Sequence, residues 1–188
     1  MAFPTFRGNI MNKNAAAGLR PYVNSFLAHF RSRLRAPAAP AQSSAQVSIE
    51  TSVERVWQVL ADIERWPSWN QAVETAKLQG GVAPGSVFVW KSQGYTVRST
   101  LQAVAPGQRL TWTGAAFGTR AFHSWDLEAT DGGVLVTTRE SFDGWLPRLF
   151  PQAMQRKLED TLPRWLAALK AAAERSTTSP QSPSGLKP

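Results

Sequence analysis

Apolar residues recur every three or four positions along residues 53–66, the spacing that places them on one face of an α-helix. A hydroxyl at Thr51 or Ser52 is suited to cap the start of this helix, because a serine or threonine oxygen can accept an unpaired backbone N–H. Pro67 is expected to interrupt the helix, since proline lacks an N–H and has a fixed φ. The face that we expect to be buried comprises Val56, Val59, Leu60 and Ile63.

A second helical pattern runs from Pro147 to about Glu174. Its apolar positions lie three and four residues apart and form one continuous face over the length of the segment. Pro163 lies inside this segment and is expected to kink the helix or to split it into two. The apolar face comprises Met154, Leu158, Leu162, Trp165 and Leu169.

The residues between the two helical segments follow a strand pattern. Short runs rich in β-branched and aromatic residues are separated by turn residues such as Pro84-Gly85, Pro106-Gly107 and Asp131-Gly132-Gly133. A further short strand, 46–50, precedes the first helix. The strands predicted after that helix are Ala72–Leu78, Val87–Ser92, Tyr95–Val104, Arg109–Gly114, Arg120–Glu128 and Val134–Phe142.

This order of elements predicts an α+β fold. A meander of antiparallel strands with one apolar face must cover that face, and the C-terminal helix is the only element long enough to do so. We therefore expect a curved antiparallel sheet wrapped around the long C-terminal helix, with the shorter helical segment closing one end.

The two ends of the chain differ from this body. Residues 36–45 (APAAPAQSSA) and 176–188 have the composition of a linker and a tail, which limits the folded unit to residues 46–175. Phe26, Phe30 and Leu34 share one helical face within the basic segment 15–35. This segment is interpreted as a helix on a membrane surface, as an organelle transit peptide, or as a poorly ordered extension.

Charge is distributed unevenly along the chain. The formal net charge is +8, but residues 1–45 carry six basic residues and no acidic one, whereas residues 46–175 carry 14 basic and 13 acidic residues. A nucleic-acid-binding surface requires clustered lysine and arginine on structured elements. The nearly neutral body therefore argues against nucleic acid as a partner.

Several kinds of site are excluded or disfavoured by composition. The chain has no cysteine, which rules out disulfides and thiolate ligands and is compatible with the cytoplasm. Two histidines far apart in the sequence argue against a metal site, and no glycine-rich phosphate loop or nucleophile elbow occurs. No apolar run reaches the ~18 residues that span a bilayer. We expect neither a metal nor a cofactor.

Several phrases of the sequence, in this order, resemble the START-like superfamily and, within it, the polyketide cyclase/dehydrase-like SRPBCC proteins. The phrases are TSVERVWQVLADIERWPSWN (51–70), APGSVF (83–88), HSWDLE (123–128), DGG (131–133) and ESFDG (140–144). The resemblance covers about residues 46–175. It implies a helix-grip fold with a cavity between helix and sheet, but no particular reaction, because its members include lipid carriers, hormone receptors and aromatase/cyclases.

Strand alternation indicates which side chains face such a cavity. On the strand 120–128, the more apolar set contains His123 and Trp125 and is expected to point inward, whereas the two faces of the last strand cannot be ranked. The resemblance adds Trp69, at the corner that commonly borders the entrance. The candidate ligand-binding residues are Trp69, Phe88, Trp90, Arg98, Trp112, His123, Trp125, Glu140, Met154 and Leu158.

His123 is the weak catalytic candidate. A desolvated imidazole can act as a general base near neutral pH, but a histidine in this position is more often a hydrogen-bonded wall residue. Arg98 and Glu140 either form a buried pair that orients a ligand or point to solvent.

Three functions follow from these residues. The first is binding or carriage of a small hydrophobic ligand such as a lipid, a quinone or a polyketide. The second is a metal-independent polyketide cyclase or dehydratase that uses His123. The third is a structural or partner-binding module whose interior is filled by its tryptophans.

Overall fold

The computed structural model describes residues 39–175, and the predictions made for residues 1–38 and 176–188, among them the amphipathic segment 15–35, lie outside that range. No helix within the described residues is long and apolar enough to cross a membrane. In chain order the elements are β1 (Ala41–Ile49), α2 (Val53–Ala61), the 3₁₀ helix η1 (Ile63–Ser68), β2 (Val73–Gln79), β3 (Val87–Ser92), β4 (Tyr95–Ala105), β5 (Arg109–Ala116), β6 (Thr119–Thr130), β7 (Gly133–Asp143), α3 (Trp145–Leu149) and α4 (Pro151–Glu174).

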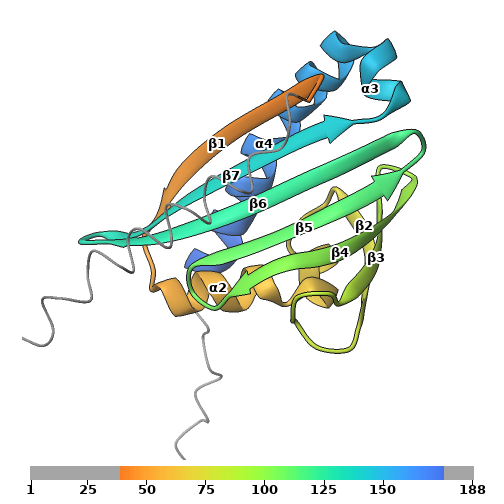
Figure 1. The fold of residues 1–188 in the computed structure, drawn as a ribbon. Helices are drawn as coiled ribbons and strands as arrows, with labels where there is room; N and C mark the ends of the chain where they lie inside the picture. Colours follow the sequence, from red (N-terminus) through yellow and green to blue (C-terminus); the bar gives the residue numbers. More distant parts are fainter. Residues whose placement is uncertain (1–38, 176–188) are drawn as a thin grey trace, which may run out of the picture. The chain divides into compact units, whose positions relative to one another are not determined.

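The seven strands form one antiparallel sheet in the order β1-β7-β6-β5-β4-β3-β2. Consecutive strands from β2 to β7 are neighbours, and β1 pairs with β7 at one edge (Figure 1). The register shifts between Val73 and Thr75 in β2 and between Leu101 and Ala103 in β4. Such bulges increase the local twist, so the sheet bends. The predicted α+β architecture is confirmed.

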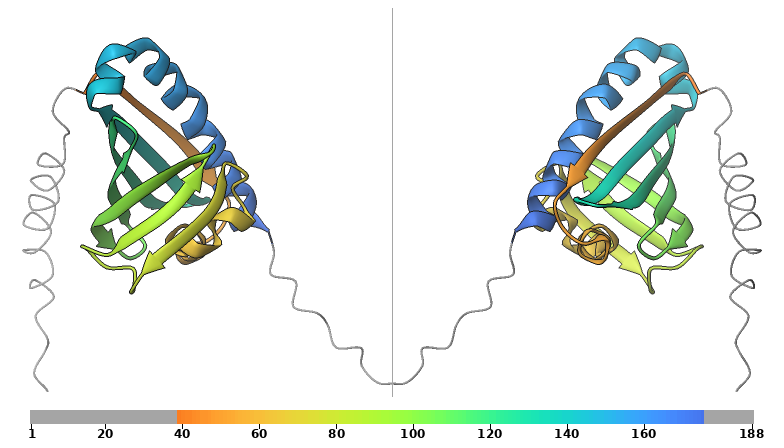
Figure 2. Two further views of the ribbon diagram at one scale, coloured as in Figure 1. Left: turned by 90° about the vertical axis from the view of Figure 1, so that its right-hand side faces the viewer. Right: turned by 90° about the vertical axis from the view of Figure 1, so that its left-hand side faces the viewer.

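Helix α4 packs along β1 and fastens that edge strand (Figure 2). The Gln155 side chain accepts a hydrogen bond from the Gln42 amide, and the Glu174 carboxylate accepts one from the Glu50 amide beyond the strand. Lys170 donates to the Ser48 carbonyl oxygen at 2.8 Å. These side chains occupy backbone groups that an edge strand would otherwise leave free for another strand.

The end of the sheet near the C-terminus of α4 is closed by α2 and η1. Ser52 Oγ caps α2 by accepting the Arg55 N–H, and Arg55 donates to the carbonyl oxygens of Ala172 and Ala173 in α4. The predicted helix breaks at Asp62, five residues before Pro67, and Pro67 is accommodated inside η1. The other end of the sheet holds α3, the tip of the β5–β6 hairpin and the start of α4 (Figure 1).

Two sequence-based boundaries are corrected. The first strand begins at Ala41 rather than at residue 46, so residues 41–45, assigned to a linker, belong to the sheet. Their alternate side chains are small because α4 packs against this strand. The C-terminal helical segment divides at Phe150, before Pro151, and not at Pro163. Pro163 is exposed, so the carbonyl that loses its N–H partner faces water.

Candidate ligand-binding cavity

Tryptophan side chains fill the interior at the closed end. Trp66 of η1 lies at the centre, with ring centroids of its neighbours 5.3 to 5.9 Å away, and its Nε1 donates to the Leu60 carbonyl oxygen at 2.9 Å. Most of these contacts are edge-to-face, an arrangement that aromatic pairs favour. The rings that surround Trp66 are Phe88, Trp90, Trp112 and Trp165.

The other end of the interior is open. A cavity of about 360 Å³ lies between α4 and strands β3 to β7, and its wall is mainly apolar. This volume lies within the range of small-molecule sites. The full lining is Trp90, Ser92, Gln93, Tyr95, Val97, Gly114, Ala116, Phe117, Thr119, Ala121, His123, Glu140, Phe142, Leu146, Met154, Lys157, Leu158, Thr161 and Trp165.

His123 lies where the aromatic cluster meets the cavity. Its ring is 4.6 Å from Trp112 and 5.4 Å from Trp125 between centroids. Its Nε2 lies 2.8 Å from Thr138 Oγ1, and its Nδ1 lies 3.4 Å from Glu140 Oε1. The side chains of His123 and Glu140 are 3% and 13% exposed. Both ring nitrogens therefore face a protein oxygen, and the His123–Glu140 pair forms a polar spot in the cavity wall.

Five of the predicted site residues line the cavity. They lie on β3, β6, β7 and α4 and are Trp90, His123, Glu140, Met154 and Leu158. The inward face predicted for β6 is confirmed, since His123 lines the cavity and Trp125 belongs to the apolar core. The face of β7 that could not be ranked is now assigned: Glu140 and Phe142 line the cavity, and Thr138 is buried on the same side.

The other five predicted residues do not line it. Phe88, Trp112 and Trp125 are at most 1% exposed and belong to the filled end, as does Trp69, whose ring is 5.9 Å from Trp165. Arg98 is exposed on the opposite face of β4, because its neighbour Val97 points into the cavity. Arg98 therefore forms no buried pair with Glu140.

The residues at the open end of the cavity, which we call its mouth, were not among the predicted site residues. Lys157 on α4 lines the cavity, and its Nζ lies 5.5 Å from the centre of the Tyr95 ring, which comes from β4. Thr161 lies one turn further along α4. A signal for both was present, since they are three and seven residues after Met154 and share its helical face.

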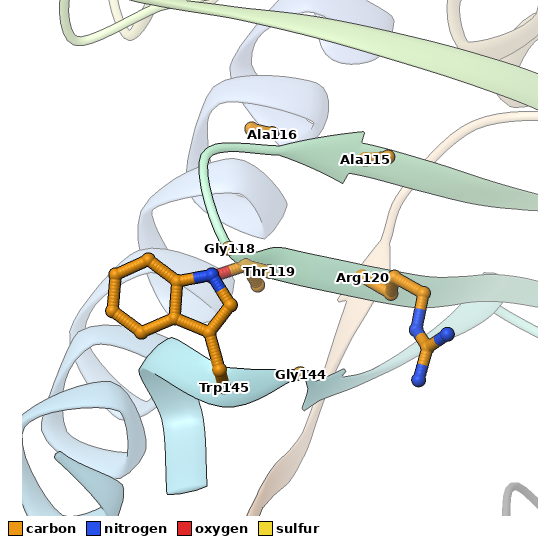
Figure 3. Close-up of a pocket in the computed structure, with 7 residues that line it drawn as sticks. All are labelled: Ala115, Ala116, Gly118, Thr119, Arg120, Gly144 and Trp145. Carbon is orange, nitrogen blue, oxygen red and sulfur yellow. The ribbon is translucent and has the colours of Figure 1, made fainter. Parts of the chain in front are cut away.

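The mouth is fastened on one side by a contact between α3 and the β5–β6 hairpin. The Phe117 and Trp145 rings meet edge to face at 5.4 Å, and the Leu146 amide donates to the Gly118 carbonyl oxygen at 3.2 Å. A groove of about 580 Å³ lies on this contact, and Figure 3 shows the Trp145 indole lying over the turn at Gly118. The groove is open and shallow, so we favour the cavity under α4 as the candidate site.

Asp143 connects β7 to this end of the molecule. The hydrogen bond from the Gly144 amide lowers the pKa of the Asp143 carboxyl below its ordinary value. The guanidinium groups of Arg120 and Arg148 lower this pKa further. The two arginines approach its carboxylate oxygens to 3.2 and 3.1 Å. The carboxylate thus joins the β5–β6 hairpin to α3.

The sheet, the long helix and the cavity between them define a START-like helix-grip protein. Solved structures that share this fold include a START superfamily protein from Mycobacterium smegmatis, with a TM-score of 0.61 and 14% identity over 71% of this chain and 97% of that one. The aromatase/cyclase Zhui from a Streptomyces species has a TM-score of 0.62 and 16% identity over 71% and 93% of the two chains. A hypothetical protein from Helicobacter pylori has a TM-score of 0.61 and 20% identity over 71% and 86%.

Sequence comparison identifies the family. Residues 40–174 match the family described as polyketide cyclase/dehydrase and lipid transport, and the chain belongs to it. A search of curated proteins finds no match to the sequence. The resemblance stated above is therefore confirmed, whereas structural likeness at these identities concerns the fold alone.

Proposed function

We propose that this protein binds or carries a small hydrophobic molecule in the cavity beneath α4. The observation that carries the proposal is the cavity of about 360 Å³ with a mainly apolar wall and one open end. Removing apolar surface from water contributes roughly 25 cal/mol per Å², so an apolar guest can be held without many specific contacts. The family description, which includes lipid transport, is consistent with this function.

Two measurements test the proposal. Native mass spectrometry of the full chain purified from its own host should reveal a retained small molecule. In a second assay, Nile red should bind the purified protein, and Thr161→Trp should abolish this binding because the new ring occupies the cavity. Ala167→Trp introduces the same ring on the exposed face of α4 and should leave dye binding unchanged. Equal dye binding by both variants, or none by the native protein, would reject the proposal.

A second candidate function is a metal-independent polyketide cyclase or dehydratase. The observation in its favour is the His123–Glu140 pair at 3.4 Å in the cavity wall, because a carboxylate–imidazole pair can accept a proton from a bound substrate. The aromatase/cyclase Zhui shares the fold. Glu140→Gln should then remove turnover of a polyketide substrate while Nile red binding persists. The open cavity is evidence against the third candidate, a module with a filled interior.

A further inference from the structure

Lys157 lies at the mouth of the cavity, where its side chain extends from α4 toward β4. It projects from the second turn of α4, and its ammonium group lies over the ring of Tyr95 on β4. Both residues line the cavity and both are exposed. A cation over an aromatic ring at an exposed position is only weakly held, so an entering group of opposite charge can replace this contact.

The charges of the cavity are arranged along its length. Three ionisable side chains line it, namely His123, Glu140 and Lys157. The first two are largely buried and lie 3.4 Å apart, so they face each other in the inner wall. The ion pairs within residues 39–175 do not include Lys157. The cavity therefore has an uncompensated positive charge at its mouth.

The nearby arginines do not add to the charge of the lining. Arg120 and Arg148 both pair with Asp143, and neither lines the cavity. Thr119 and Ala121 line the cavity, so Arg120 between them points to the opposite face of β6. Lys157 is therefore the basic residue that an entering head group meets.

Exposed apolar side chains lie at the same end of the sheet. The large hydrophobic side chains that are exposed within residues 39–175 are Tyr95 and Phe117, which line the cavity, and Trp145, Leu149 and Phe150, which lie in α3 or directly after it. An exposed apolar cluster is usually a binding surface. A ligand that enters here meets apolar side chains and positive charge together, and then an apolar interior.

We infer that the ligand is an anionic amphiphile, whose apolar body occupies the cavity and whose single acidic head group pairs with Lys157 at the mouth. This inference rests on the proposed function and specifies its ligand class. A neutral ligand would bury part of the Lys157 ammonium without a partner, which is unfavourable. A cationic head would be repelled by Lys157. The acidic head can be a carboxylate or a phosphate monoester.

Compounds that share one alkyl chain and differ only in the head group test the inference. Dodecanoate, dodecyl phosphate, dodecanol and dodecylamine would each displace Nile red from the full chain below their micellar concentrations. A hydrogen-bonded pair with a charged group is worth about 1.5–3 kcal/mol, so at least one of the two acids should bind about tenfold more tightly than the alcohol. The amine should bind most weakly. The tighter of the two acids identifies the head group.

The variant Lys157→Gln separates charge from burial. It should weaken binding of the preferred acid about tenfold and leave binding of dodecanol unchanged. Arg156→Gln removes a positive charge from the neighbouring position, which does not line the cavity, and should preserve the ratio of acid to alcohol affinity.

The outcomes separate this inference from the proposed function. Equal binding of acids and alcohol, or an equal loss for both in Lys157→Gln, would overturn the inference while leaving cavity binding in place. Failure of Nile red and of all four compounds to bind would overturn the proposed function itself.

Discussion

Trp66 and Trp125, two tryptophans of the filled end, differ in whether the indole N–H has a hydrogen-bond partner. Substitution by phenylalanine tests this difference. Trp66 and Trp125 are both 0% exposed. Trp66 Nε1 donates to the Leu60 carbonyl oxygen, whereas Trp125 Nε1 has no hydrogen-bond partner within residues 39–175. Replacement by phenylalanine removes the indole N–H and the same part of the ring from each site. The loss of ring volume is common to the two variants, so their difference reports on the N–H group.

The expected difference follows from the cost of unpaired polar groups. Leaving a buried donor or acceptor unsatisfied costs about 1–3 kcal/mol. Trp66→Phe leaves the Leu60 carbonyl without this donor, while Trp125→Phe removes a donor that is already unpaired. At the lower limit, Trp66→Phe loses about 1 kcal/mol by leaving the carbonyl unpaired, and Trp125→Phe regains about 1 kcal/mol by removing an unpaired N–H. We therefore expect Trp66→Phe to be less stable than Trp125→Phe by about 2 kcal/mol.

Urea unfolding followed by far-UV circular dichroism measures this difference without relying on tryptophan fluorescence. The difference between the two midpoints gives the difference in free energy of unfolding directly when the variants share one slope, which reflects the surface exposed on unfolding. Equal destabilisation, or a greater loss in Trp125→Phe, would refute the assignment of the paired and unpaired nitrogens.

Three further predictions concern the cavity and its mouth. His123→Ala should leave Nile red affinity within a few-fold if the protein is a carrier, and a loss beyond about tenfold would assign His123 to ligand binding. Gly144→Ala should lower the melting temperature more than Gly80→Ala, because both glycines have positive φ but only a Cβ at Gly144 overlaps the Gly118 carbonyl oxygen; equal losses would contradict this. Asp143→Asn should lower the melting temperature at neutral pH, and the gap should close as the pH falls through the lowered pKa of the Asp143 carboxyl. A gap that stays constant or widens in acid would exclude this role.

Most of the fold could be predicted because its signals are local. Alternating apolar positions between glycine and proline turns located the strands from β2 to β7 to within two residues of their observed ends. Their antiparallel order follows from short connections. The start of β1 was missed because alanine and serine, which suit a strand packed closely against α4, also suit a linker.

The helix breaks depended on surroundings that a local pattern does not contain. Proline is costly in a helix because it removes an N–H and crowds the preceding turn, yet Pro163 lies on the exposed side of α4. The actual break precedes Pro151, which occupies the first turn of α4, where its missing N–H removes no intrahelical bond. Position within the helix, rather than the presence of proline, determined the outcome.

The sequence predicted which side chains of the candidate site point inward, but not which of them line the cavity and which lie in the filled end. Strand alternation correctly turned Trp90, His123 and Trp125 inward, yet alternation carries no information on how far along the sheet the interior is filled. That depends on where η1 places Trp66. Lys157 was passed over because a charged residue on an amphipathic helix is normally assigned to its solvated face.

The filled end and the open end depend on each other. A cavity persists only if its walls resist collapse, since the packed interior gains dispersion energy by closing a void. Trp66 contacts rings from β3, β5 and α4, so it holds the helix away from the sheet at one end. At the other end the Phe117–Trp145 contact joins the β5–β6 hairpin to α3. The tryptophans thus shape the space for a ligand without lining most of it, and a guest that enters past Lys157 meets a preformed site and loses little affinity to ordering it.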